Sequence, residues 1–259
     1  MLKSINLLGV RITDETEEKV SEYVLERVKN GREKTFVVTP NPEILVYAHA
    51  HSAYKDKLNS AQVALADGVG LLGAAQVLGK PLKERITGVD FIEKLCRDVQ
   101  KPEFMTNGKA LSMGFLGGRG GVAEKAAHRL LEKYPWLNVV FIAEEWSEAG
   151  FRLGLKNHES GIMNQGKKEI DILFVAYGFP KQEEWIAENL EKLPIRMAMG
   201  VGGSFDYLSG KVTRAPKVVR SLGLEWLFRL IREPWRIRRQ TALFKFIILV
   251  FKERLSSKN

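Results

Sequence analysis

The chain has 259 residues, of which 45% are hydrophobic and 27% are charged, enough apolar residues for an ordinary core. Its one cysteine, Cys96, excludes an internal disulfide, and no Cys and His cluster supports a structural zinc site. The N-terminal residues lack the apolar stretch and cleavage site of a signal peptide. No run of about 18 uninterrupted apolar residues could span a bilayer, so we expect a cytoplasmic protein.

The net charge of +9 is distributed unevenly along the chain. Residues 211–259 contain 13 Lys and Arg against 3 Asp and Glu, whereas residues 1–210 contain 27 against 28. The basic character therefore belongs to the C-terminal segment, which suggests an anionic partner for that segment alone. We predict two parts, an α/β domain over residues 1–210 and a helical, basic and aromatic appendage over residues 211–259.

Residues 1–210 alternate short apolar runs with amphipathic segments. We expect a strand or hairpin at 5–13, then a helix at 14–31 with Asp14 as N-cap and Gly31 as its stop. Further strands are expected at residues 35–41, 61–68, 111–118, 138–146, 170–178 and 195–203. Further helices are expected at residues 42–51, 69–80, 86–100, 122–135 and 180–193. Residues 147–168 are rich in glycine and polar residues and give no clear pattern.

This alternation, with nearly all-apolar strands, predicts a Rossmann-like α/β fold with a mainly parallel sheet covered by helices on both faces. In such sheets ligands bind at the carboxyl ends of the strands. The residues that directly follow the expected strands are mostly polar or glycine: Thr39 to Asn41, Asp67 and Gly68, Gly117 to Gly121, Gly178 to Gln182, and Gly200 to Ser204. Their concentration at one sheet edge predicts a binding site there.

The glycines of "FLGGRGGVAEKAA" run from a strand into a helix, where backbone N–H groups could bind a phosphate. The register is not that of G-x-G-x-x-G, and the same glycines could serve only to make the turn. Because the sequence contains no G-x-x-x-x-G-K-[ST], an ATPase is not expected.

Asp67 ends an apolar strand, where it could be a helix N-cap, part of an Asp-Gly turn, or a partly desolvated general base. Thr39 and Asn41 precede prolines and could equally make turns. Arg85 could pair with a phosphate or with a surface carboxylate. The four histidines have no partners at metal or triad spacing and are interpreted as structural or surface residues.

Six motifs occur together in order: "VVTPNPE", "ALADGVG", "ERITGVDF", "FLGGRGGVAEKAA", "AYGFPKQE" and "GVGGSFDYLSGKVTRAP". Over residues 35–216 they resemble the WecG/TagA/CpsF family of bacterial glycosyltransferases (glycosyltransferase family 26), closest in kind to its TagA-type members. The resemblance implies transfer of N-acetylmannosamine from UDP-ManNAc to the 4-OH of undecaprenyl-diphosphate-linked GlcNAc, for wall teichoic acid or a related surface glycan. UDP-ManNAc uronic acid and UDP-glucuronic acid remain alternative donors. Residues 147–171 depart from the plainer helix expected of the family.

The resemblance also implies roles for individual residues, with residues 1–210 as the catalytic domain. Asp67 is expected as the base, with Arg85 and Gln182 as further catalytic residues. The expected substrate-binding residues are Thr39, Asn41, Gly68, Gly117, Gly118, Lys181 and Gly202. An inverting transfer also needs a group that stabilises the departing diphosphate. Since the sequence has no D-x-D, we expect neither a metal nor a cofactor and assign that task to arginines and glycine N–H groups.

The segment "EWLFRLIREPWRIRRQTALFKFIILVF" mixes tryptophan, arginine and aliphatic residues. Tryptophan favours the lipid headgroup level, and basic residues near anionic lipid contribute about 1 kcal/mol each. We therefore expect peripheral binding to the inner face of the plasma membrane, where tail residues could also reach the acceptor diphosphate. The residues expected in this role are Trp226, Arg229, Arg232, Trp235 and Arg236. The alternative is that these helices pack on the body or on a second copy of the chain.

Two other classes of function explain fewer features of the sequence. A nucleotide-dependent oxidoreductase would use Glu144 or Glu145 to bind a ribose after the glycine turn, but this leaves five motifs unexplained. A nucleic-acid-binding module would use the basic tail, but its aromatic and aliphatic residues favour lipid, so we expect no nucleic-acid partner.

Overall fold

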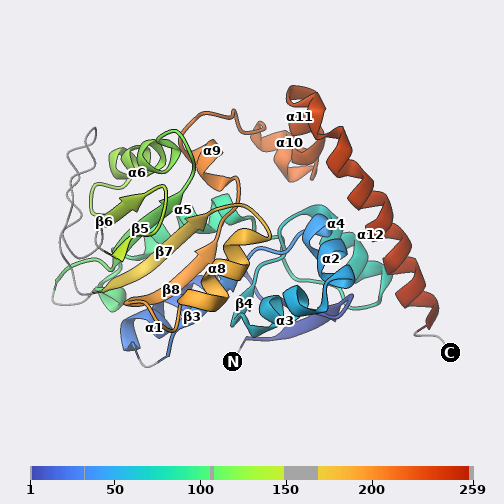
Figure 1. Ribbon diagram of the computed structural model, residues 1–259, viewed down its shortest axis with the longest axis horizontal. Helices are drawn as coiled ribbons and strands as arrows, with labels where there is room; N and C mark the ends of the chain where they lie inside the picture. The colour runs from blue at the N-terminus through green and yellow to red at the C-terminus, as the bar shows by residue number, and fades with distance from the viewer. Residues whose placement is uncertain (1, 32, 106–107, 149–168, 257–259) are drawn as a thin grey trace.

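The computed structural model describes residues 2–31, 33–105, 108–148 and 169–256, apart from the side chains of residues 236 and 238–240. The fold is α/β, with a six-stranded sheet in the order β4-β3-β8-β7-β5-β6 in which all pairs are parallel (Figure 1). Its strands are β3 (Thr35–Val38), β4 (Val63–Ala64), β5 (Ser112–Gly117), β6 (Asn138–Ala143), β7 (Ile170–Ala176) and β8 (Ile195–Gly200). A separate antiparallel hairpin joins β1 (Ser4–Leu7) to β2 (Val10–Thr13). The expected Rossmann-like sheet and opening hairpin are confirmed.

Helices cover both faces of the sheet because successive residues of a strand point to opposite sides. In β3, Val37 belongs to one apolar cluster, whereas Phe36 and Val38 belong to the other. The first cluster is covered by α1 (Glu17–Asn30), α5 (Gly88–Asp98), α6 (Val122–Lys133) and α9 (Ser204–Leu208). The second is covered by the hairpin and by α2 (Pro42–Ala50), α3 (Ser52–Ser60), α4 (Val69–Val77) and α8 (Lys181–Asn189).

The start of α1 differs from the sequence prediction. The N-cap is Thr16, whose side chain accepts a hydrogen bond from the Lys19 N–H, and not Asp14. Asp14 instead accepts a hydrogen bond from the backbone N–H of Lys83 at 2.8 Å and so ties the hairpin end to the loop before α5. Gly31 ends the helix in the left-handed conformation, as expected.

Three short elements also differ from the sequence prediction. The expected strand at 61–68 forms ladder pairs only over the two residues of β4. The helices α3 and α9 were not predicted, since α3 buries only Tyr54 and Leu58 and α9 is five residues long. Most of the segment 147–168, which gave no sequence pattern, lies outside the described residues.

The C-terminal segment is helical: α10 (Lys217–Ser221), α11 (Glu225–Arg232), η2 (Pro234–Arg236) and α12 (Ile237–Ser256). The long helix α12 packs along α2 and α4 (Figure 1). Phe246 and Val250, one turn apart, are buried there, and Glu253 accepts a hydrogen bond from the Leu8 N–H at 3.1 Å. One face of the tail is therefore part of the core of the body.

The opposite face of α12 is apolar and exposed. At 100° per residue most of its members lie across the helix from Phe246 and Val250, and Ile247 lies at one flank. They are Phe244, Ile247, Ile248, Phe251 and Leu255, which we call the outer face of α12. Within the described residues, we find no helix whose length and apolar character would let it cross a membrane.

Two phenylalanines of α12 give a matched test of how the tail docks. Phe246 is 2% exposed and Phe244 is 70% exposed. Phe246→Ala should lower the free energy of unfolding by about 3–5 kcal/mol because it opens a cavity against α2 and α4. Phe244→Ala should change it by less than about 0.5 kcal/mol. Denaturant titration of both variants checks this, and equal losses would contradict the docking of α12.

Candidate active site

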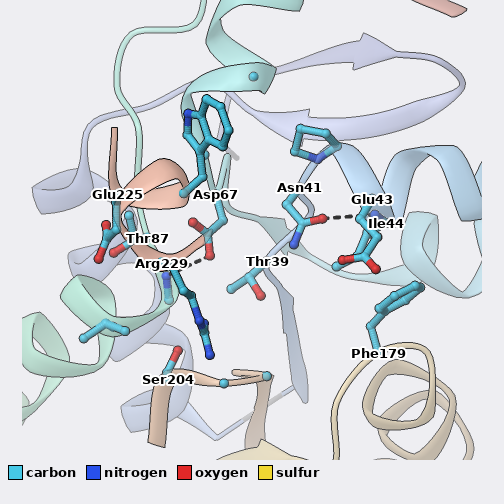
Figure 2. Close-up of a pocket in the computed structure, with 18 of the residues that line it drawn as sticks. Thr39, Asn41, Glu43, Ile44, Asp67, Thr87, Phe179, Ser204, Glu225 and Arg229 are labelled. Carbon is cyan, nitrogen blue, oxygen red and sulfur yellow. Dashed lines mark hydrogen bonds between the residues drawn. The ribbon is translucent and has the colours of Figure 1, made fainter. Parts of the chain in front are cut away.

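A cavity of about 990 Å³ lies where β3, β4 and β8 end, between the sheet and the C-terminal helices. The body contributes residues that follow the strands, and the tail contributes residues of α11 and α12. Nine of the residues expected from the sequence to have individual roles line it: Thr39, Asn41, Asp67, Gly68, Arg85, Gln182, Gly202, Trp226 and Arg229. Figure 2 shows the Asp67 carboxylate and the Arg229 guanidinium pointing into the space near Thr39 and Ser204. Parallel strands thus bring together residues far apart in sequence.

Asp67 is half-buried and does not cap α4, the helix that follows it. The N-cap of α4 is Gly68, and the Asp67 carboxylate instead accepts a long hydrogen bond of 3.4 Å from the Gly88 N–H at the start of α5. Burial raises the pKa of the Asp67 carboxyl to about 6, and the nearby carboxylate of Glu225 adds to the rise, while the Gly88 N–H and Arg85 oppose it. A carboxyl with this pKa is ionised at neutral pH and basic enough to accept a proton.

Thr39 and Asn41 shape the turn after β3. The Thr39 hydroxyl is buried and donates to the Gly200 carbonyl at 3.1 Å, which joins the ends of β3 and β8. Asn41 caps α2, since its Oδ1 accepts from the Ile44 N–H at 3.0 Å. This use of the oxygen leaves the amide nitrogen on the cavity side, as Figure 2 shows. Asn41 therefore serves both as a cap and as a cavity wall.

The two expected residues at the start of α8 have different environments. Gln182 is 1% exposed and bonds to protein at both ends of its amide, donating to Glu183 at 2.7 Å and accepting from the Gly202 N–H at 2.8 Å. Lys181 is exposed and does not line the cavity. Only Gln182 is placed to influence the cavity.

The sequence reasoning missed the role of Arg214, although it lies within the motif "GKVTRAP". Its two Nη atoms each lie 2.7 Å from an oxygen of the Asp90 carboxylate, and its Nε donates to Glu225 at 3.2 Å. Asp90 is in α5 and Glu225 is in α11, so Arg214 links the body to the tail. The Thr87 hydroxyl, which caps α5, also donates to Asp90 at 2.6 Å.

The expected tail residues divide into two groups. Trp226 and Arg229 line the cavity, and the Arg229 guanidinium lies 4.9 Å from the centre of the Tyr207 ring. Arg232 stacks on Phe228 outside the cavity, and Trp235 is also exposed and outside it. The side chain of Arg236 lies outside the described part of the structure.

The glycine loop after β5 stands apart from the cavity. Neither Gly117 nor Gly118 lines it. A Cβ at Gly117 would lie 2.7 Å from the Ala176 backbone, so close packing against β7 accounts for this glycine. The Gly121 N–H donates to the Glu144 carboxylate at 3.0 Å, so an acidic side chain of the protein already occupies this N–H.

The described residues contain no group of three or more His, Cys, Asp or Glu side chains that could hold a metal ion. Three histidines lie in described segments, on α2 or at its end and on α6, and none of them lines the cavity. His158 lies outside the described residues.

Comparison with known proteins identifies a family that matches nearly the whole chain. Residues 5–259 match the model of the glycosyl transferase WecG/TagA/CpsF family. The chain belongs to this family of glycosyl transferases. Relatives from Staphylococcus aureus strains MRSA252, MW2 and NCTC 8325 / PS 47 are each 30% identical over 255 residues, which cover 98% of this chain and 94% of each relative. All three are named N-acetylglucosaminyldiphosphoundecaprenol N-acetyl-beta-D-mannosaminyltransferase.

The chain is therefore an enzyme of the glycosyltransferase class, and the resemblance seen in its six motifs is confirmed. The match also covers the tail, beyond the 35–216 range of the motifs. An oxidoreductase does not fit this family, and the glycine loop it would need lies away from the cavity. The individual residue roles remain predictions.

Asp67→Asn tests the burial of this carboxyl through stability. Because the folded-state pKa is raised, the folded protein holds the proton more tightly than the unfolded chain. The tighter proton binding by Asp67 therefore stabilises the folded protein fully below about pH 4, and this stabilisation is lost as the pH rises through about 6. We expect Asp67→Asn to melt higher than the native protein at pH 7, by a larger margin than at pH 4. Thermal melts at both pH values check this, and a margin that does not grow with pH would contradict it.

Proposed function

We propose that this enzyme transfers N-acetylmannosamine from UDP-ManNAc to the 4-OH of undecaprenyl-diphosphate-linked GlcNAc, in wall teichoic acid or related surface-glycan synthesis. The observation that carries the proposal is the half-buried Asp67 carboxylate in a large cavity of a chain that matches named N-acetylmannosaminyltransferases over 98% of its length.

In this proposal Asp67 takes the proton from the acceptor hydroxyl, and the oxygen of that hydroxyl bonds to C1 of the donor sugar. The bond from C1 to the UDP oxygen breaks at the same time, and UDP leaves with the electron pair. Arg85 and Arg229 line the cavity and can oppose the charge of the departing diphosphate. The Arg229 Nε also donates to a carboxylate, that of Glu233, at 3.1 Å. Arg214 is more fully engaged and less suited, because all three of its guanidinium nitrogens donate to Asp90 or Glu225.

The charges of the cavity favour a neutral donor sugar over a uronic acid. Three carboxylates line it, those of Glu43, Asp67 and Glu225, and three guanidinium groups, those of Arg85, Arg214 and Arg229. The guanidinium groups are already assigned, since Arg214 pairs with Asp90 and Glu225, and Arg85 and Arg229 are proposed to face the diphosphate. A uronate would add a further negative charge, and a like charge in a partly desolvated site is unfavourable. This supports UDP-ManNAc over the UDP-ManNAc uronic acid and UDP-glucuronic acid alternatives.

We also propose that the outer face of α12 lies on the anionic inner surface of the plasma membrane. Its five exposed apolar side chains occupy one side of a helix whose other side is held by the core. Lys245 and Lys252 lie at one edge of this stripe by helical spacing. Ala242 and Leu243 of the same helix line the cavity, so membrane contact would place the cavity near a lipid-linked acceptor.

The reaction is tested by measuring UDP release with UDP-ManNAc and a lipid-diphosphate-GlcNAc analogue. We expect acceptor-dependent release by the native protein and a loss of at least about 1,000-fold in Asp67→Asn, because the base is removed. The native kcat/KM should fall below about pH 6 as the Asp67 carboxyl takes up a proton. A variant that keeps most of its rate would remove Asp67 from the role of base. Parallel assays with the two uronic acid donors test the choice of sugar.

Membrane binding is tested by flotation with vesicles that contain anionic lipid. Ile248→Glu with Phe251→Glu should lower vesicle binding at least about tenfold, because it places two charges on the outer face of α12. Lys125→Glu, at an exposed position of α6, changes the net charge by the same amount and is the matched control. Equal flotation of both variants would contradict the proposed surface.

A further inference from the structure

Two buried polar residues at the start of α8 form a short chain of hydrogen bonds that ends at the cavity. Glu183 is fully buried and Gln182 is 1% exposed. The Gln182 Nε2 donates to Glu183 Oε1 at 2.7 Å, and its Oε1 accepts from the Gly202 N–H at 2.8 Å. Gly202 belongs to the turn between β8 and α9 and lines the cavity.

The Glu183 carboxylate and the Gly202 N–H both require the same orientation of the Gln182 amide. An ionised carboxylate can only accept hydrogen bonds, so the amide must turn its nitrogen toward Glu183 and its oxygen toward Gly202. Burial raises the pKa of Glu183 to about 6, which still leaves it mostly ionised at neutral pH. Charge also strengthens this hydrogen bond in a buried setting. Glu183 thereby stabilises the orientation in which Gln182 offers its oxygen to the Gly202 N–H.

The turn that Gln182 holds adjoins two groups with proposed roles in the reaction. A Cβ at Gly203 would lie 3.6 Å from both Nη atoms of Arg229. A Cβ at Gly88 would lie 3.0 Å from the Ser204 hydroxyl, and the Gly88 N–H is the donor to Asp67. A shift of residues 202–204 would therefore change the packing around both Arg229 and Asp67.

We propose that Glu183 is a positioning residue, which orients the amide of Gln182 so that Gln182 holds the turn at residues 202–204 against Arg229 and the Asp67 side of the cavity. This inference rests on the proposed function for its effect on rate. It changes the expected role of Gln182, which acts on the turn through Gly202 and does not need to touch the reacting atoms.

Exchanging the two side chains separates this role from direct substrate contact. Gln182→Glu alone puts two carboxylates together and removes the donor to Glu183, so transfer should fall at least tenfold. In the double variant Gln182→Glu with Glu183→Gln, the new carboxylate accepts from the Gly202 N–H and from the new amide. The hydrogen bonds are then the same as in the native protein, with the carboxylate at position 182 and the amide at position 183. At least about a third of the native rate should therefore return.

Hydrogen exchange of the peptide that contains Gly202 gives a readout that does not depend on activity. Gln182→Glu should speed exchange there by disturbing the turn, and the double variant should restore protection. If Gln182→Glu does not fold, Glu183→Gln replaces it. Its amide can either donate or accept, so the turn should exchange faster and the kcat should fall at least threefold.

Several outcomes would overturn the proposal. A double variant that regains protection at Gly202 but no activity would mean that the Gln182 amide nitrogen itself contacts substrate. Native exchange and native rates in either single variant would show that the hydrogen-bond chain has no positioning role. Absence of transfer by the native protein would instead refute the proposed function and, with it, the effect on rate inferred here, whereas the exchange measurements would still test the orientation of Gln182.

Discussion

The wall that α11 gives to the cavity is held by an ionic link, the guanidinium of Arg214 between Asp90 and Glu225. The sheet alone provides an open edge, as any parallel sheet does at the carboxyl ends of its strands. Arg214 binds both oxygens of Asp90 on α5 and reaches Glu225 on α11, so it holds α11 above that edge, while core packing holds α12. A two-pronged arginine contact specifies orientation as well as attraction. The tail then supplies the second wall.

The tail also shows how one helix can serve both core and surface. Phe246 and Val250 bury one face of α12 against the body. This packing prevents the helix from rotating and so fixes the direction of its other face. A free amphipathic tail would bury its apolar side chains in any way open to it. Because the core already holds one face of α12, the outer face stays exposed, and the cavity keeps a fixed relation to that surface.

The sequence predicted the part of the site that depends on strand ends. Thr39 and Asp67 each follow a buried parallel strand, and such positions meet at one edge whatever the details of packing. The sequence did not predict that the glycine turn at Gly117 lies outside the cavity, because this depends on the order of the strands in the sheet. Gly117 follows β5, which lies on the far side of β7 from β8, β3 and β4. Arg214 was missed because its partners come from α5 and α11, and no local pattern records that contact. Thr16 replaced Asp14 as a cap because both residues fit the local preference and tertiary contacts decide between them.

The commitment of Arg214 to other carboxylates also bears on the proposed base. A cation paired directly with Asp67 would lower the pKa of its carboxyl and make it a poor proton acceptor. Arg214 lines the same cavity, yet Asp90 and Glu225 take its hydrogen bonds, and Glu225 stays close enough to raise the pKa of Asp67. The same network therefore holds a wall of the cavity and, through Glu225, adds to the rise that burial causes in the pKa of Asp67. Leaving a half-buried carboxylate without a directly paired cation costs energy, and local destabilisation of this kind is what the proposed role of general base would require.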